Sequence, residues 1–218
     1  MNKIIGFSEV VPHFKDGLTI LYGGFLGVGT PAGLVRTLLE TGVHDLTIVG
    51  NDTAFPDSGV GPLVTNRRVR KVITSHIGTN PETGRQMIAG ELEVELVPQG
   101  TLAERVRCGG AGLGAVLTET GIGTLVEEGK PKLCLDGKEY LVERAIRGDI
   151  ALIKAKRADR SGNLVFEKAA RNFNPLMALA ADLVIVETDE LVEVGELDPE
   201  CIVTPGVVVH KIVLTGGQ

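Results

Sequence analysis

The sequence lacks tryptophan, and aromatic residues make up only 4% of its 218 residues. It also lacks any apolar run near the ~20 residues that a membrane-spanning helix needs, and its first residues show no charged-then-apolar signal segment. We therefore expect a cytoplasmic protein with no membrane association and an aliphatic core. The length favours a single domain over residues 1–218.

Cysteine is scarce and irregularly spaced, with only Cys108, Cys134 and Cys201 present. An odd number at wide spacing is neither a disulfide framework nor a set of metal ligands, and it suits a reducing compartment. We expect Cys134, in an apolar stretch, and Cys201, in a late loop, to be packing residues. Cys108 precedes a glycine run, but a nucleophilic role needs a lowered pKa. The sequence therefore predicts no metal site and leaves the role of Cys108 open.

Positive charge is limited: 22 Lys and Arg stand against 28 Asp and Glu, for a net charge of −6. The single basic cluster, at residues 67–71, is short and fits a solvated face before a strand. No basic block and no basic recognition helix offers a surface that could follow a phosphate backbone. We therefore exclude a nucleic-acid-binding role.

Glycine, by contrast, is abundant at 29 residues, and its densest run follows the first clear strand pattern. Residues 18–22 are an apolar run of strand formers, and apolar positions at helical spacing then extend to Glu40. Pro31 suits the first helical turn, and Thr30 suits its N-cap. The intervening glycines leave backbone amides bare at the positive end of a helix, which predicts a site for an anion or a polarised carbonyl.

The spacing Gly27-x-Gly29-x-x-Ala32 satisfies the loose form of the dinucleotide-binding fingerprint. Asp52 follows the next predicted strand, roughly where an acid that binds a ribose is expected. Glycines are also tolerated at any strand-to-helix turn, and Asn51-Asp52 is common turn chemistry. A ligand site and a plain turn therefore both stay open at these positions.

Strand and helix patterns alternate along most of the chain. Strands are expected at residues 18–22, 45–49, 71–75, 94–97, 132–135, 139–143, 150–153, 183–186 and 207–214. Helices are expected at residues 8–15, 31–40, 61–65, 81–89 and 173–180, and around Leu102 and Val106. This order predicts an α/β fold, a mostly parallel sheet flanked by helices, with an antiparallel hairpin at Asp136-Gly137.

Two features of this alternation bear on a site. His76 follows the predicted strand 71–75 and precedes Gly78-Thr79-Asn80; a lone His is usually structural, although a site role stays open. Residues 109–129 have little periodicity and are too long for an idle connection. We expect this segment to be a loop and a candidate lid.

The glycine-rich stretch resembles the first signature of the class I coenzyme A transferases. Its fixed positions are met by Asp16, Gly17, Gly23, Gly24, Phe25, Gly29 and Pro31. The resemblance continues through residues 51–53, 75–80, 90–102, 109–112 and 171–175. It thus covers nearly the whole chain, and in detail it resembles the α subunit of the bacterial acetate/acetoacetate CoA-transferases, which implies a CoA-transferase-like fold.

The resemblance implies a ping-pong transfer of CoA between a short-chain acyl-CoA, such as acetyl-CoA or butyryl-CoA, and a carboxylate such as acetoacetate or acetate. The intermediate is a glutamyl-CoA thioester, and in the family its glutamate belongs to a Ser-Glu-Asn-Gly motif. This chain has no such motif. We therefore expect a β subunit to supply the glutamate, in a heterotetramer of two α and two β subunits (α2β2). Coenzyme A is a substrate, and no covalently bound cofactor is expected.

The resemblance also assigns site residues. Gln99 matches the glutamine that donates its amide to the oxyanion, although a plain helix-start residue is the alternative. The segment associated with CoA comprises Gly24, Phe25, Leu26, Gly27, Val28, Gly29 and Thr30; whether it contacts CoA or shapes the acyl pocket stays open. The substrate loop expected at the carboxylate end comprises Gly109, Gly110, Ala111 and Gly112. The competing hypothesis is a ligand-sensing or nucleotide-binding α/β module without transferase activity.

Overall fold

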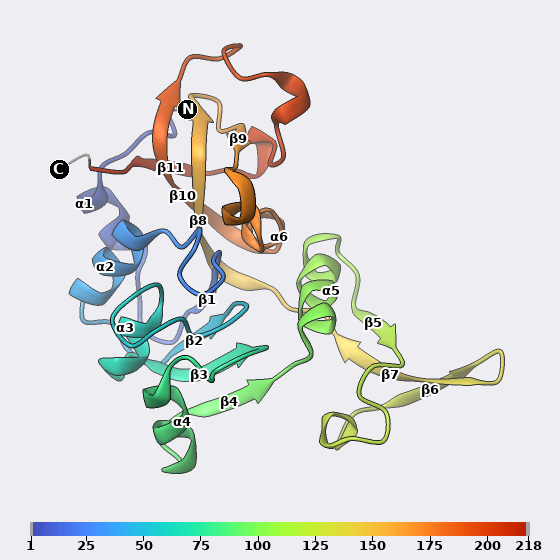
Figure 1. Ribbon diagram of the computed structural model, residues 1–218. Helices are drawn as coiled ribbons and strands as arrows, with labels where there is room; N and C mark the ends of the chain where they lie inside the picture. Colours follow the sequence, from blue (N-terminus) through green and yellow to red (C-terminus); the bar gives the residue numbers. More distant parts are fainter. Residues whose placement is uncertain (1, 217–218) are drawn as a thin grey trace.

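The main sheet is built from parallel strands in the order β11-β10-β8-β1-β2-β3-β4, with the short β9 pairing antiparallel to β8 (Figure 1). The computed structural model describes residues 2–216. The strands are β1 (Thr19–Tyr22), β2 (Leu46–Val49), β3 (Val69–Thr74), β4 (Glu93–Leu96), β8 (Gly148–Asp159), β9 (Leu164–Val165), β10 (Ala181–Val192) and β11 (Lys211–Leu214). The predicted fold class, a mostly parallel α/β sheet, is confirmed.

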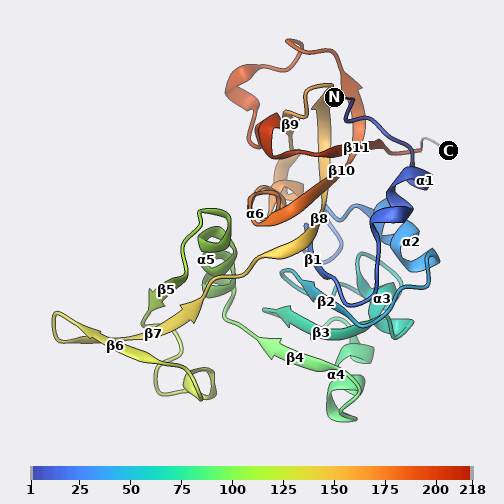
Figure 2. The same ribbon diagram turned by 180° about the vertical axis from the view of Figure 1, so that it is seen from behind.

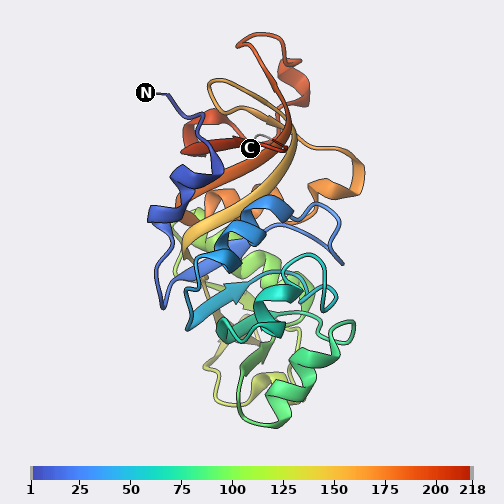
Figure 3. The ribbon, with the colours of Figure 1, turned by 90° about the vertical axis from the view of Figure 1, so that its left-hand side faces the viewer.

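Helices cover both faces of this sheet. The α-helices are α1 (Phe7–Val10), α2 (Ala32–Glu40), α3 (Gly61–Thr65), α4 (Pro81–Ile88), α5 (Gln99–Gly110) and α6 (Asn174–Leu179). The 3₁₀ helices are η1 (Val11–His13), η2 (Leu125–Glu127), η3 (Lys168–Arg171), η4 (Pro199–Cys201) and η5 (Gly206–Val208). Figure 3 looks onto the face that carries α1 to α4. No helix within residues 2–216 is long and apolar enough to cross a membrane.

The alternation of side chains along β1 explains this layering. Ile20 packs into a buried cluster with Leu34 and Leu63 of α2 and α3, while its neighbour Leu21 packs into a second cluster with Leu102 of α5. Successive strand residues point to opposite faces, so a strand buried on both sides must be apolar throughout. This requirement is the reason that the central strands could be located as short apolar runs.

A second, three-stranded antiparallel sheet, which we call the arm, projects from the body (Figures 1 and 2). Its strand order is β5-β7-β6, from β5 (Ala115–Thr118), β7 (Lys138–Arg144) and β6 (Lys132–Leu135). The predicted hairpin is confirmed, with Asp136 and Gly137 at φ 49° and 77°. The expectation that residues 109–129 form one loop is wrong, because this segment contains the end of α5, β5 and η2.

Other differences lie at the ends of elements. The first predicted helix divides into α1 and η1, and the first part of the predicted strand 207–214 is the 3₁₀ helix η5. Strands β8 and β10 reach 12 residues each. Their apolar halves were predictable, whereas their polar continuations, such as Arg157 paired with Glu190, form regular sheet only because the two strands extend side by side.

Candidate functional site

The glycine-rich segment after β1 folds as a tight turn. The amide of Phe25 donates to the carbonyl of Val28, and the amide of Val28 donates back to Phe25, both at 2.9 Å. The two central residues, Leu26 and Gly27, have φ 49° and 84°. Positive φ at both central positions is the geometry of the type I′ turn. The turn therefore presents the side chains of Phe25 and Leu26 at the end of β1, where they are 43% and 36% exposed.

Two asparagines from the far end of the sequence hold this turn in place. The Asn172 side chain accepts from the Gly24 amide at 3.0 Å and donates to the Val28 carbonyl at 2.9 Å. Asn174, which is fully buried, donates to the Gly29 carbonyl at 3.0 Å. A Cβ on Gly29 would lie 2.4 Å from the carbonyl oxygen of Ala170. The two family motifs, at residues 16–31 and 171–175, are thus halves of one structural unit.

The expectation of bare amides at a helix N-terminus does not hold. The amide of Gly24 donates to Asn172 and that of Leu26 to Asp52, so the loop uses these donors within the chain. Helix α2 begins at Ala32, and no side chain of the adjoining Pro31 or Thr30 caps it, so the predicted Thr30 N-cap is wrong.

The positive end of α2 is instead occupied by Glu187 from β10. Its Oε2 accepts from the Leu34 amide at 3.0 Å, and its Oε1 pairs with Lys154 Nζ at 3.2 Å. Glu187 is only 2% exposed. A buried carboxylate at this position compensates the helix dipole, so the helix end is not available to an external anion.

A pocket of about 360 Å³ opens where β1, β2 and β3 end. Its lining comprises Phe25, Leu26, Asn51, Asp52, Ser75, His76, Thr79 and Gln99. Ligands of parallel α/β sheets gather at the carboxyl ends of the strands. The structure thus brings together members of four features predicted from the sequence, which are the glycine segment, Asn51-Asp52, His76 and Gln99.

A chain of hydrogen bonds crosses the floor of this pocket and ends at Gln99. Asn51 Nδ2 donates to Asp52 Oδ2 at 2.8 Å. The orientation of the Asn51 amide is therefore fixed, because a carboxylate can only accept, and Asn51 Oδ1 must face Gln99 and Ser75. Gln99 Nε2 donates to this oxygen at 2.6 Å, and Ser75 Oγ lies 3.2 Å from it. One N–H of the exposed Gln99 side chain thus remains for a ligand.

Asp52 acts as the anchor of this network. Its carboxylate accepts from the Leu26 amide at 2.9 Å, from the Ala54 amide at 2.7 Å and from Asn51, and it is 3% exposed. Tyr22 donates its hydroxyl to the Asp52 carbonyl at 2.6 Å. Burial, followed by the charge of Asp52, raises the pKa of Tyr22 well above its usual value, so the phenol stays a neutral donor. With its oxygens so engaged, Asp52 lacks the freedom that a ribose-binding acid needs.

The sequence analysis did not select Ser75 and Thr79 as site residues. Ser75 follows β3, and its Oγ donates to the Asn51 carbonyl at 2.7 Å. Thr79 Oγ1 donates to the Ala54 carbonyl at 2.7 Å, which holds the segment after β3 against that after β2. The available signal was the family resemblance at residues 75–80, which begins at the end of the predicted strand 71–75. His76 is exposed on the pocket rim, and its backbone continues the parallel pairing through a bridge to Asp52.

The predicted substrate loop at Gly109, Gly110, Ala111 and Gly112 is wrong as a loop, because Gly109 and Gly110 are the last residues of α5. A Cβ on Gly109 would lie 1.9 Å from the Ile146 carbonyl oxygen, and one on Gly110 would lie 2.8 Å from the Leu179 Cβ. These glycines allow α5 to approach the body closely. A role of Ala111 and Gly112 near a substrate carboxylate stays a prediction.

The cysteines lie away from the pocket. Cys108 is buried beneath β5, with its Sγ 3.8 Å from the Ala115 carbonyl oxygen. Cys134 and Cys201 are exposed, so the expectation that they are packing residues is wrong. No three His, Cys, Asp or Glu side chains come together as potential metal ligands within residues 2–216.

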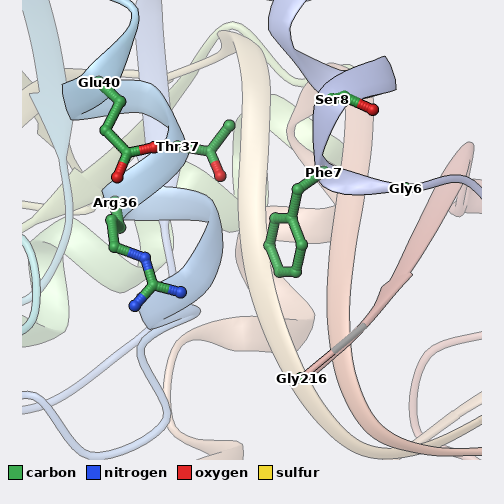
Figure 4. Close-up of a pocket in the computed structure, with 7 residues that line it drawn as sticks. All are labelled: Gly6, Phe7, Ser8, Arg36, Thr37, Glu40 and Gly216. Atoms are coloured by element: carbon green, nitrogen blue, oxygen red, sulfur yellow. The ribbon is translucent and has the colours of Figure 1, made fainter. Parts of the chain in front are cut away.

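A larger pocket, of about 470 Å³, lies between α1 and α2 (Figure 4). Phe7 and Ser8 of the first helix and Arg36, Thr37 and Glu40 of α2 border it. None of the signature glycines, and none of the residues in the Asp52-to-Gln99 network, lines it. The smaller pocket beside Gln99 is therefore the candidate functional site.

Comparisons with known proteins identify the family of this chain. The family model described as "Coenzyme A transferase" matches residues 7–215. The chain is 62% identical over 214 residues to the acetate CoA-transferase subunit alpha of Escherichia coli K12, covering 98% of this chain and 97% of that protein. It is 50% identical to the acetoacetyl-CoA:acetate/butyrate CoA transferase alpha subunit of Clostridium acetobutylicum, covering 97% of each chain.

Solved structures share the fold. An acyl-CoA transferase from E. coli O157:H7, described as a thioester complex with CoA, matches with a TM-score of 0.88 at 23% identity. The match covers 98% of this chain and 47% of that one, so this chain spans about half its length. The glutaconate coenzyme A-transferase of Acidaminococcus fermentans matches with a TM-score of 0.85 at 20% identity, covering 97% of this chain and 75% of that one. With the family model spanning residues 7–215, the chain belongs to the coenzyme A transferase family.

Proposed function

We propose that this chain is the α subunit of a CoA-transferase that exchanges CoA between a short-chain acyl-CoA and acetate or acetoacetate. The observation that carries the proposal is a pocket with an oriented amide donor, Gln99, and no glutamate in its lining. The full sequence has no Ser-Glu-Asn-Gly motif either. A β subunit therefore supplies the glutamate nucleophile, and the two subunits form a heterotetramer with two copies of each. The names of the relatives, an acetate and an acetoacetyl-CoA:acetate/butyrate transferase, support the substrate class.

The chemistry requires two covalent exchanges on the partner's glutamate. Its carboxylate attacks the acyl-CoA carbonyl, and CoA leaves as a thiolate while an acyl-glutamyl anhydride forms. The thiolate then attacks the glutamyl carbonyl, which releases the first acid and leaves a glutamyl-CoA thioester. The second acid repeats these steps in reverse. Each attack passes through a tetrahedral intermediate whose oxygen carries a negative charge.

Gln99 is placed to donate to such an oxygen. Its amide is oriented by Asn51, which is oriented by Asp52, so the donor does not have to reorganise when the charge develops. Phe25 and Leu26 form an apolar side of the same pocket, which suits a short acyl chain. Because the amides of Gly24 and Leu26 are already engaged, we assign residues 24–30 to shaping the acyl pocket and not to binding CoA phosphates.

The test compares this chain alone, its β subunit alone and the mixture. We expect transfer between acetoacetyl-CoA and acetate, followed through the absorbance of the acetoacetyl-CoA enolate, only in the mixture. Mass spectrometry after incubation with acyl-CoA alone should find the CoA adduct on a β-subunit glutamate. Turnover by this chain alone at the rate of the mixture, or a CoA adduct on one of its own glutamates, would refute the proposal.

A further inference from the structure

The arm has one covered face and one open face. Directly opposed residues of antiparallel strands share a face, and Leu117 opposes Val142 while Leu133 opposes Tyr140. With the adjoining positions of the same parity, this gives one apolar set, which we call the apolar arm face. It comprises Ala115, Leu117, Leu133, Leu135, Tyr140 and Val142.

The opposite face of the arm packs against the body at its base, around Leu141 and Glu143. Leu141 and Glu143 point to it and are 0% and 2% exposed. Glu143 pairs with Lys130, and Arg105 of α5 lies 3.8 Å from its carboxylate. The apolar arm face has no such cover within residues 2–216, since Leu133 and Leu135 are each 44% exposed. A three-stranded sheet that leaves a row of apolar side chains in water is a mark of an interaction surface.

The charges around this face indicate the kind of partner. Lys138 opposes Leu135 at one end, and Arg144 opposes Ala115 at the other, so both cations belong to the same face of the arm. The strand positions of this face carry no acidic residue, and the acid at its edge, Glu119, lies 3.9 Å from Lys138. If two copies of this chain paired through this face, neither Lys138 nor Arg144 would meet a carboxylate from the strand positions of the other copy. The complement is an apolar surface bordered by Asp or Glu side chains.

The position of the arm links this surface to the active site. Figure 1 shows the arm on the side of the molecule toward which β2, β3 and β4 point. That edge of the sheet also bears the pocket with Gln99, which is the first residue of α5, the helix that leads into β5. A protein seated on the arm therefore lies on the side of the sheet where a second subunit has to deliver its glutamate.

We propose that the apolar arm face is the anchor by which this chain binds its β subunit, through an apolar surface with an acidic rim on the partner. This inference rests on the proposed function, because it takes the β subunit as the occupant. A standard interface involves roughly 20–30 residues a side, so the six residues of this face are the apolar core of a larger contact. Hot spots are found in such cores.

The experiment uses the full-length chain carrying Leu133→Glu together with Leu135→Glu. Both side chains are exposed in the isolated chain, so the variant should fold with an unchanged circular dichroism spectrum. Its Kd for the β subunit, measured by biolayer interferometry, should rise about 30-fold or more, as expected when central contacts of an interface are lost. The matched control is Ile88→Glu, which is 85% exposed and belongs to α4, a helix that Figure 1 shows apart from the arm, and which should leave Kd unchanged.

A second variant tests the same inference through the charge of the face instead of its apolar side chains. Arg144→Glu should weaken binding most at low salt, because screening removes the benefit of charge complementarity. An unchanged Kd for both variants, with wild-type binding intact, would overturn the inference and leave the proposed function standing. Failure of the wild-type chain to bind the β subunit would overturn both. If the wild-type chain is a dimer that Leu133→Glu with Leu135→Glu converts to monomers while β-subunit binding is retained, the face pairs copies of this chain and the inference is wrong.

Discussion

Replacement of Gln99 by alanine is the most direct test of the site. The change removes the amide that Asn51 orients and leaves the helix start intact, because alanine is the best helix former. Asn51 also lines the open pocket, so a water molecule can replace the lost donor at its Oδ1. We therefore expect the free energy of unfolding to fall by no more than about 1 kcal/mol, the usual net value of one hydrogen bond.

The effect on turnover should be much larger. Loss of a single oxyanion donor costs about 10²–10³ in kcat, or about 2.7–4 kcal/mol of transition-state stabilisation. Because the donor acts mainly on charge that develops during the reaction, kcat should fall more than the affinity for acyl-CoA. Gln99→Glu should be at least as damaging, since a carboxylate in place of the amide would face Asn51 Oδ1, which cannot donate to it.

The assay combines thermal melting with kcat normalised to active sites on the same preparation of the assembled enzyme. We expect a Tm near that of wild type and a kcat reduced at least about 100-fold, as for the loss of other oxyanion donors. If Gln99→Ala instead turns over at the wild-type rate and only its stability changes, Gln99 is a helix-start residue and the proposed donor role is refuted.

Two further predictions concern stability. Gly29→Ala should lower the free energy of unfolding by about 2–4 kcal/mol, because the backbone there has φ 77° and the new Cβ would lie 2.4 Å from the Ala170 carbonyl oxygen. A urea titration measures this loss. The control is Gly84→Ala, whose Cβ would meet nothing within 4 Å and which should be neutral or stabilising. Equal effects would contradict the packing argument. Burial alone would raise the pKa of Glu95, but the hydrogen bond and charge of Arg105 hold it below its usual 4.5. This carboxylate therefore stabilises the fold above pH 4.5, and the contribution is lost as the pH falls through the lower folded pKa. Glu95→Gln should flatten the decline of Tm below pH 4.5, and an unchanged decline would contradict the assignment.

Local features of the fold were predictable from the sequence. Asp136-Gly137 needs only its own two residues to adopt positive φ, and the buried strands needed only their apolar composition. The N-cap of α2 was not predictable in this way, because the side chain that accepts from its Leu34 amide is Glu187, 153 positions away. Thr30 fitted the local pattern of an N-cap, but in the folded chain a tertiary contact with Glu187 takes that role.

In the candidate site, too, local features were predictable and contacts between distant residues were not. Gln99 was reached through the family resemblance, and its position after a strand agreed with the general rule for α/β sheets. Its orientation depends on Asn51, 48 positions away, which no spacing in the sequence discloses. Gly109 and Gly110 were predicted to belong to a substrate loop because glycine favours both loops and close packing, and only the neighbouring Ile146 and Leu179 distinguish the two.

The link between the first glycine turn and Asn174 has a consequence for how the chain folds. The donor and acceptor lie 145 positions apart, and a ribosome adds about 5–20 residues per second, so roughly 7–30 s separate the synthesis of the two partners. During that interval the amide of Gly24 and the carbonyls of Val28 and Gly29 have no access to the asparagines that will hold them. The glycine turn beside the candidate site therefore cannot complete its hydrogen bonds until residues 172–174 are made, and a chain interrupted before residue 172 would carry the signature sequence without its structure.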